Sequence, residues 1–436
     1  MFKTLGNAWK IPELRKKLIF TAMIMLIYRI GNRLPVPFVN VQGLLNFFDA
    51  TLQGTVLGFY NTLSGSAFSQ ATILALSVQP YINSSIIVQL LTIAIPALER
   101  LQKDGGEEGK KKLARITRYT TVALGLLMGW AYAMMLRNYS AQYNILSSDM
   151  NFFNYAVIVL TFTAGSALVM WLGDQITEFG IGNGISIILF ANIISRFPDS
   201  IIGTVSGLIA GTTKWWVATI MLLGIVALVL LIVYVNDAER RIPIQYAKRV
   251  VGRKVYGGQN TNLPIKVNMS GVMPVIFAQS IASLPGTILA FTNPTGKSSS
   301  GFVQFLLNIS KSSSWVYIAV YFLLIFAFSY FYAAIQYDPV EISNNLKKNG
   351  GFIPGFRPGK PTADFIRKVI NKLTLYGAVY LGIVSLLPLL AGKFLPNSST
   401  LSIGGTSVII VVGVALETVK ALEAQMLMRH YKGFLE

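Results

Sequence analysis

Apolar runs as long as a lipid bilayer is thick are the feature of this sequence that most constrains its fold. A helix that crosses the hydrocarbon core needs about 20 mostly apolar residues. Hydrophobic residues form 53% of the chain and charged residues only 13%, whereas soluble domains carry about 25% charge. We therefore predict an all-α, polytopic membrane protein with ten transmembrane helices, at 18–35, 72–97, 119–137, 152–172, 184–197, 215–235, 270–292, 315–336, 373–391 and 404–428.

Three of these segments are irregular. Pro80 lies in the second segment, where its missing N–H predicts a kink. The fifth stops at Arg196-Phe197-Pro198-Asp199 and is short for a helix that spans alone. The tenth is apolar only as far as Leu416, and charged residues begin at Glu417.

Positive residues are distributed unevenly between alternate loops. The N-terminus, every second loop and the C-terminus hold 29 Lys and Arg residues, whereas the intervening loops hold 5. Cytoplasmic loops of membrane proteins collect Lys and Arg. We therefore predict a multi-pass protein with both termini in the cytoplasm. The same distribution accounts for most of the net charge of +19 without a DNA partner.

Two of the predicted cytoplasmic loops, 236–269 and 337–372, are too long to be simple connections. In the first loop, apolar residues such as Tyr246 and Val250 alternate with basic residues, which favours an ordered structure. The basic residues either only mark the cytoplasmic side or form a docking site for an acidic partner. The interleaved apolar residues favour docking.

The predicted external segment 36–71 is also unusual, because it is long and contains no Lys or Arg. Its second half is rich in small residues, yet Leu57, Tyr60, Leu63 and Phe68 are too apolar for a fully solvated loop. The segment is either a plain external loop or, as we predict, a segment that folds back into a cavity.

Several kinds of chemistry are excluded by the residues that are missing. The chain has no cysteine and a single histidine, His430, which rules out a zinc centre or a catalytic site built from these residues. No phosphate-binding P-loop pattern occurs, and 180–186 lacks the context of a dinucleotide site, so we predict a tight turn there. We predict no enzyme activity, no cofactor and no metal.

Eight short motifs, taken in order, resemble the SecY/Sec61 alpha family of protein translocases across nearly the whole chain. One motif alone is weak, but this order in a chain with ten predicted spans is specific. The motifs are Phe59–Gly65, Gln79–Ile87, Gln175–Ser186, Tyr246–Arg249, Leu263–Asn268, Asn344–Lys348, Pro354–Gly359 and Gly404–Ser407.

The resemblance implies a fold and a function. The expected fold has two pseudo-symmetric, inverted five-helix halves, 1–209 and 210–436, around an hourglass pore. The expected function is a protein-conducting channel in the bacterial plasma membrane, which passes unfolded secretory polypeptides and releases signal sequences and membrane helices sideways into lipid. The implied partners are the SecE and SecG subunits, the SecA ATPase, the ribosome, membrane lipid and a polypeptide that bears a signal sequence.

The resemblance also places a pore constriction on six aliphatic residues. Each of the first two pairs has i,i+4 spacing and therefore lies on one helical face. A ring of aliphatic side chains can block ions by dewetting, and its non-directional contacts can close around any polypeptide. Taken singly, each residue could equally face lipid or pack in a core. The six are Ile82, Ile86, Ile185, Leu189, Ile276 and Ile410, where Leu189 departs from the isoleucine of many relatives.

Three further sets of residues follow from the resemblance. The plug, about 59–70, comprises Phe59, Tyr60, Asn61, Thr62, Leu63, Ser64, Gly65, Ser66, Ala67 and Phe68. A lateral gate between helices two and three and helices seven and eight includes Ser85, Gln89 and Asn268. Positions that contact a motor or ribosome are Arg241, Arg253, Lys254 and Arg357.

Two other classes of function compete with the channel, namely a secondary transporter for a small solute and an intramembrane enzyme. Both usually need ionisable residues near the middle of the bilayer. Glu417 and Lys420 are the candidates within a span, and they lie toward its cytoplasmic end. The sequence therefore favours the channel.

Overall fold

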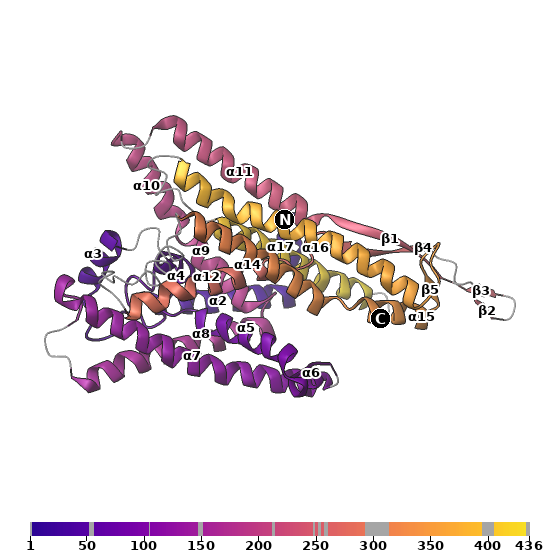
Figure 1. Ribbon diagram of the computed structural model, residues 1–436, viewed down its shortest axis with the longest axis horizontal. Helices are drawn as coiled ribbons and strands as arrows, with labels where there is room; N and C mark the ends of the chain where they lie inside the picture. The colour runs from indigo at the N-terminus through magenta and orange to yellow at the C-terminus, as the bar shows by residue number, and fades with distance from the viewer. Residues whose placement is uncertain are drawn as a thin grey trace.

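The computed structural model describes residues 2–51, 56–103, 105–146, 151–211, 214–246, 249–251, 254–256, 260–292, 314–394 and 405–432. Within these residues the chain is mostly helical, and the long helices run side by side along the longest axis of the molecule (Figure 1).

The helices of the first half of the chain are α1 (Phe2–Lys10), α2 (Pro12–Gly31), α3 (Val41–Thr51), α4 (Val56–Leu63), α5 (Gln79–Ala94), α6 (Pro96–Lys103), α7 (Gly106–Tyr143), α8 (Phe152–Phe179), α9 (Gly184–Ile194) and α10 (Phe197–Ile209). The second half contains α11 (Trp215–Asp237), α12 (Met273–Thr292), α14 (Trp315–Gln336), α15 (Pro339–Lys348), α16 (Lys360–Phe394) and α17 (Gly405–Lys432). It also contains the strands β1 (Glu239–Tyr246), β2 (Arg249–Val251), β3 (Lys254–Tyr256), β4 (Asn260–Lys266) and β5 (Gly351–Phe352).

Six helical spans among the described residues are long and apolar enough to cross a membrane, and a seventh exists if α5 and α6 are one broken span. The remaining predicted segments are also occupied by helices, namely α2, α12 and α17. The polytopic helical fold is therefore observed, and the count of ten spans stays a prediction. The six are Gly106–Ser140, Phe152–Phe179, Gly184–Ile209, Trp215–Asp237, Trp315–Lys348 and Lys360–Ala391.

The second predicted span differs from expectation. Pro80 lies in the first turn of α5, where its missing N–H has no helical partner to lose, so the kink predicted there is wrong. The bend lies at Pro96 instead, where α5 and α6 meet at 107°. Ile95, just before this proline, is extended at φ −113° and ψ 110°, because proline disfavours helical geometry in the residue that precedes it.

The fifth predicted span is built from two helices. α9 ends at Ile194, and α10 begins at Phe197 with Pro198 in its first turn. Together they form a span of 26 residues. The predicted end of the span near Pro198 is therefore wrong, because α10 continues it and supplies the length that α9 lacks.

The two long loops join at one end of the molecule, on the right of Figure 1. They form a three-stranded antiparallel sheet in the order β4-β1-β5, in which Gln245 of the first loop pairs with Phe352 of the second. Ile244 and Ile265 share an apolar cluster with Leu346, Ile353 and other residues beneath this sheet. The order predicted for 236–269 is confirmed for its described residues, among which β2 and β3 also pair antiparallel.

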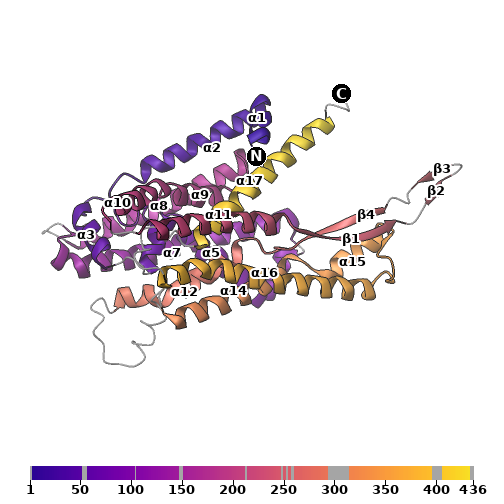
Figure 2. The ribbon, with the colours of Figure 1, turned by 90° about the horizontal axis from the view of Figure 1, so that it is seen from above.

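The two terminal helices also lie together. α1 packs against α17, and Ala8 and Leu14 share an apolar cluster with Leu422 and Ile181. α3 lies at the opposite end from the strands, as both views show (Figures 1 and 2). The molecule therefore has one end with the sheet and another with the segment around α3 and α4.

Candidate functional site

The six predicted constriction residues come together in the middle of the helical bundle. α5, α9, α12 and α17 supply them, and all six belong to one contiguous apolar cluster, which we call the central cluster. Leu63 of the predicted plug belongs to the same cluster. Ile82, Ile86, Leu189 and Ile410 are buried, whereas Ile185 and Ile276 are half-buried.

The start of α9 is fixed by the turn that precedes it. Asn183 caps the helix, because its Oδ1 accepts hydrogen bonds from the N–H groups of Ile185 and Ser186 at 3.1 and 3.3 Å. Gly184 packs so tightly that a Cβ atom there would lie 2.0 Å from the carbonyl oxygen of Gly173. The predicted tight turn is confirmed, and it places Ile185 against the central cluster.

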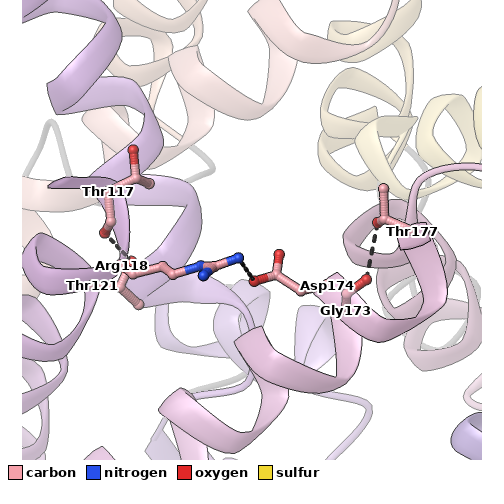
Figure 3. Close-up of polar contacts among 6 residues, drawn as sticks. All are labelled: Thr117, Arg118, Thr121, Gly173, Asp174 and Thr177. Carbon is pink, nitrogen blue, oxygen red and sulfur yellow. Dashed lines mark hydrogen bonds and ion pairs between the residues drawn. The ribbon is translucent and has the colours of Figure 1, made fainter. Parts of the chain in front are cut away.

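An ion pair fastens α7 to α8 beside this turn (Figure 3). Arg118 of α7 lies 2.9 Å from a carboxylate oxygen of Asp174 in α8, the residue after Gly173. Because the Arg118 side chain is 56% exposed, the pair contributes about 0.2–1 kcal/mol. Sequence reasoning missed this pair, although opposite charges at the adjoining ends of two consecutive spans were a readable signal.

A second tie joins α5 to α7. Ser84 lies between Ile82 and Ile86 in the sequence and is buried. Its hydroxyl donates to the carbonyl oxygen of Thr117 at 2.7 Å. Thr121 donates to the same carbonyl at 2.7 Å. The Ser84 bond therefore joins α7 to the part of α5 that carries Ile82 and Ile86, whereas the Thr121 bond lies within α7.

The predicted plug is helical only in part. α4 ends at Leu63, and 64–78 forms a series of turns with left-handed residues at Gly65 (φ 64°) and Ser66 (φ 70°). α4 contacts α9 and α12. Most of the described plug side chains are buried, among them Tyr60, Leu63, Ser64, Ala67 and Phe68; the side chain of Phe59 lies outside the described residues.

Aromatic packing secures the far end of the plug. The Phe68 ring stacks on Tyr132 with centroids 4.3 Å apart and meets Phe48 edge-on at 5.6 Å. The Tyr132 hydroxyl donates to the carbonyl oxygen of Phe68. The predicted plug thus has an apolar face toward the central cluster through Leu63 and another toward α3 and α7.

Polar contacts cross between α12 and the first half of the chain. Gln79 Nε2 donates to Ser280 Oγ at 3.4 Å, and the hydroxyls of Tyr60 and Ser283 lie 3.0 Å apart. All four side chains are buried. Sequence reasoning missed Gln79, Ser280 and Ser283, although the i,i+3 spacing of two serines in an apolar helix was a usable signal.

The residues predicted for the lateral gate are not all brought together. Ser85 and Gln89 lie half-buried on α5. Asn268 is buried, and its described hydrogen bonds go to Asn236 Oδ1 at 2.9 Å and to the carbonyl oxygen of Gly271 at 3.3 Å. Both of these partners belong to the second half of the chain, so neither of these bonds joins Asn268 to α5.

Comparison with known proteins decides the family. The SecY family model matches residues 72–419. The chain belongs to the SecY family. The protein translocase subunit SecY of Streptomyces scabiei is similar at 43% identity over 444 residues and 100% of both chains. That of Corynebacterium glutamicum is similar at 43% identity over 443 residues and 99% of both chains.

Solved structures of the SecY and Sec61 kind share the fold. A structure described as a protein conducting channel matches with a TM-score of 0.65. A SecY structure, whose plug domain is described as stabilising the closed state and maintaining a membrane seal, matches at 0.64. Sec61 from a canine ribosome–channel complex matches at 0.62. Each is 18% identical and covers 97% of both chains.

The sheet end of this SecY-family chain exposes two of the four predicted docking residues. Arg241 is exposed on β1, opposite Pro264 of β4, and Arg357 is exposed in the turn between β5 and α16. Lys254 begins β3, and Arg253 lies outside the described residues.

The turn that carries Arg357 is well defined. Gly355 and Gly359 have φ angles of 87° and 104°, which only glycine adopts readily. Thr362 Oγ1 donates to the carbonyl oxygen of Arg357 at 2.8 Å. The rings of Phe356 and Phe365 lie 4.3 Å apart. The turn therefore holds the Arg357 backbone in place while its side chain reaches solvent.

A cavity of about 190 Å³ lies between α11, α12, α14 and α17. Asn268, Glu417 and Lys420 line it, and Lys420 also pairs with Asp237 at 2.7 Å. The charges at the end of the tenth span therefore face a cavity rather than a packed apolar core.

Proposed function

We propose that this chain is the channel through which unfolded secretory polypeptides cross the plasma membrane, with signal sequences and membrane helices released sideways into lipid. The observation that carries the proposal is the convergence of six aliphatic residues from α5, α9, α12 and α17 with plug residue Leu63 in one cluster. The name of the relatives, protein translocase subunit, supports it.

The six residues form the seal of the closed pore in this proposal. Their side chains offer no hydrogen-bond partner to water or ions, so the constriction excludes both. Leu63 packs in the same cluster, which is the contact expected of a plug seated against the ring. A passing polypeptide displaces the plug, and the aliphatic side chains then close around it without regard to its sequence.

The halves 1–209 and 210–436 separate along α12 in this account. α12 contacts α4, α5 and α7, and Gln79–Ser280 and Tyr60–Ser283 are the polar contacts to break there. Two hydrogen bonds are a small barrier, since each contributes about 1 kcal/mol net. Ser85, Gln89 and Asn268 are then exposed to the arriving signal sequence.

The sheet end is the proposed cytoplasmic docking surface. It carries the basic loops, and an apolar cluster packs against its sheet. SecA and the ribosome would bind there through Arg241, Arg253, Lys254 and Arg357, with SecE and SecG as further subunits. A similar Sec61 structure is of a ribosome–channel complex. Both termini lie in the cytoplasm in this orientation.

The test is protein translocation by the purified complex in proteoliposomes. With SecA and ATP, a preprotein should become protected from added protease, and a version without its signal sequence should not. Uptake of a small solute without preprotein protection would instead support the secondary transporter, which family membership disfavours.

A further inference from the structure

Asn192 is the centre of a buried polar network that reaches the plug backbone. Its side chain is fully buried on α9, at 0% exposure. Its Nδ2 donates to the carbonyl oxygen of Leu63 and to the Tyr28 hydroxyl, both at 2.8 Å. Tyr28 in turn lies 3.0 Å from Ser77 Oγ. An amide has two N–H donors, so the plug carbonyl takes one of them.

The position of Asn192 on α9 connects this network with the pore. Asn192 follows Leu189 by three residues and Ile185 by seven, so the three lie on one face of the helix. Arg196 continues the series four residues later and donates to Thr62 Oγ1 at 2.7 Å. One face of a single span therefore carries the constriction residues Ile185 and Leu189, followed by Asn192 and Arg196, which hydrogen-bond the plug.

α2 completes the network from the other side. Asn32 lies one turn beyond Tyr28, and its Nδ2 is 3.4 Å from the carbonyl oxygen of Ser64. Gly65 fits closely between the two helices, because a Cβ atom there would lie 3.0 Å from Asn192 Oδ1 and 3.1 Å from a guanidinium nitrogen of Arg29. The plug segment 62–65 is thus contacted by α2 and the fifth span at each successive residue.

We propose that Asn192, Tyr28 and Ser77 form a latch, which positions the plug in the closed channel and sets how readily it leaves. The proposal rests on the proposed function, in which 59–70 is the plug. The latch is polar and directional, whereas the aliphatic ring is not, so the latch fixes where the plug sits. A buried carbonyl or amide without a hydrogen-bond partner is costly. When the plug is released, the Leu63 and Ser64 carbonyl oxygens must therefore exchange their bonds to the latch helices for hydrogen bonds to water.

The experiment uses a reporter cysteine in the plug of the full-length protein, which has no native cysteine. Ser69→Cys is suited to this purpose, because Ser69 is 5% exposed and its hydroxyl bonds only locally, to the Ser66 carbonyl, among the described contacts. Its rate of reaction with a membrane-impermeant maleimide in membrane vesicles then reports how often the plug leaves its seat.

Two latch variants and a matched control are compared. Tyr28→Phe keeps the ring and removes the hydroxyl that bonds Asn192 and Ser77. Because neither bond is to the plug itself, we expect about a fivefold faster reaction, which is the effect of about one net hydrogen bond. Asn192→Leu removes the amide that donates to Leu63, Tyr28 and Ser77, and we expect an increase of about tenfold or more. Tyr321→Phe is the control, because Tyr321 is equally buried and its hydroxyl bonds Thr406 at 3.1 Å, and neither residue belongs to the plug or the latch.

The outcomes distinguish failure of the latch proposal from failure of the plug assignment. With an otherwise unchanged chain, the Ser69→Cys reporter should be protected at rest and reactive while a polypeptide is held in the channel. If it is not, the plug assignment fails. If the reporter behaves as expected, two results would overturn the latch. The first is that both latch variants react at the parent rate, and the second is that Tyr321→Phe accelerates the reaction as much as Tyr28→Phe does.

Discussion

The aliphatic constriction makes a quantitative prediction about ion leak. Ile86 is 4% exposed in the central cluster, and Ile276 is half-buried there. Full burial of an isoleucine side chain is worth about 1.5–3 kcal/mol, so we assign about 2 kcal/mol to Ile86 and about 1 kcal/mol to Ile276. Replacing both with serine lowers the free-energy cost of hydrating the constriction by about 3 kcal/mol. Because about 1.4 kcal/mol corresponds to a tenfold change, the population of channels with a hydrated constriction should rise about 100-fold.

The assay is the conductance of the resting channel in planar bilayers. A matched control is Ile158→Ser with Ile325→Ser, because both isoleucines are fully buried at 0% exposure and neither is a constriction residue. We expect the constriction variant to leak far more than the wild type and the control to leak no more than the wild type. Equal conductance of the constriction variant and wild type, with normal insertion, would refute the reasoning.

Two further predictions concern orientation and docking. A cysteine at the exposed residue Phe152 should react with an impermeant maleimide from outside, and one at the exposed residue Asn349 only from the cytoplasm; the reverse pattern would invert the charge-based topology. Arg357→Glu should insert normally yet impair SecA-driven translocation, with Arg357→Lys intermediate because lysine keeps the charge without the planar fork. Unchanged translocation and SecA ATPase stimulation by Arg357→Glu would show that this arginine only marks the cytoplasmic side.

Apolar runs predicted the lipid-facing parts of the helices but not their full lengths. The span predicted at 315–336 coincides with α14, because Trp315 and Gln336 bound a continuous apolar run. By contrast, α7 begins at Gly106 rather than near 119, and α16 at Lys360 rather than near 373. Their first turns carry charged residues, so hydropathy gives no signal for a helix there.

Contacts between segments that are distant in the sequence could not be predicted from one sequence. The antiparallel contact of Gln245 with Phe352 depends on how the helices bring two loops together. The polar network of Asn192 was readable in part, because a lone amide within an apolar span is costly unless it is bonded. Its partners, Tyr28 and Leu63, lie more than a hundred residues away and required the fold.

Cross-linking of a polypeptide arrested in transit tests the central claim most directly. A translocating chain with one cysteine is stalled in the membrane, and disulfide formation is measured with cysteines placed one at a time in the channel protein. We predict adducts with Ile86→Cys and Ile410→Cys, from opposite halves of the constriction, and none with Leu222→Cys, which is 62% exposed on α11. Adducts at Leu222→Cys without any at the two constriction positions would show that the polypeptide does not pass through the aliphatic ring.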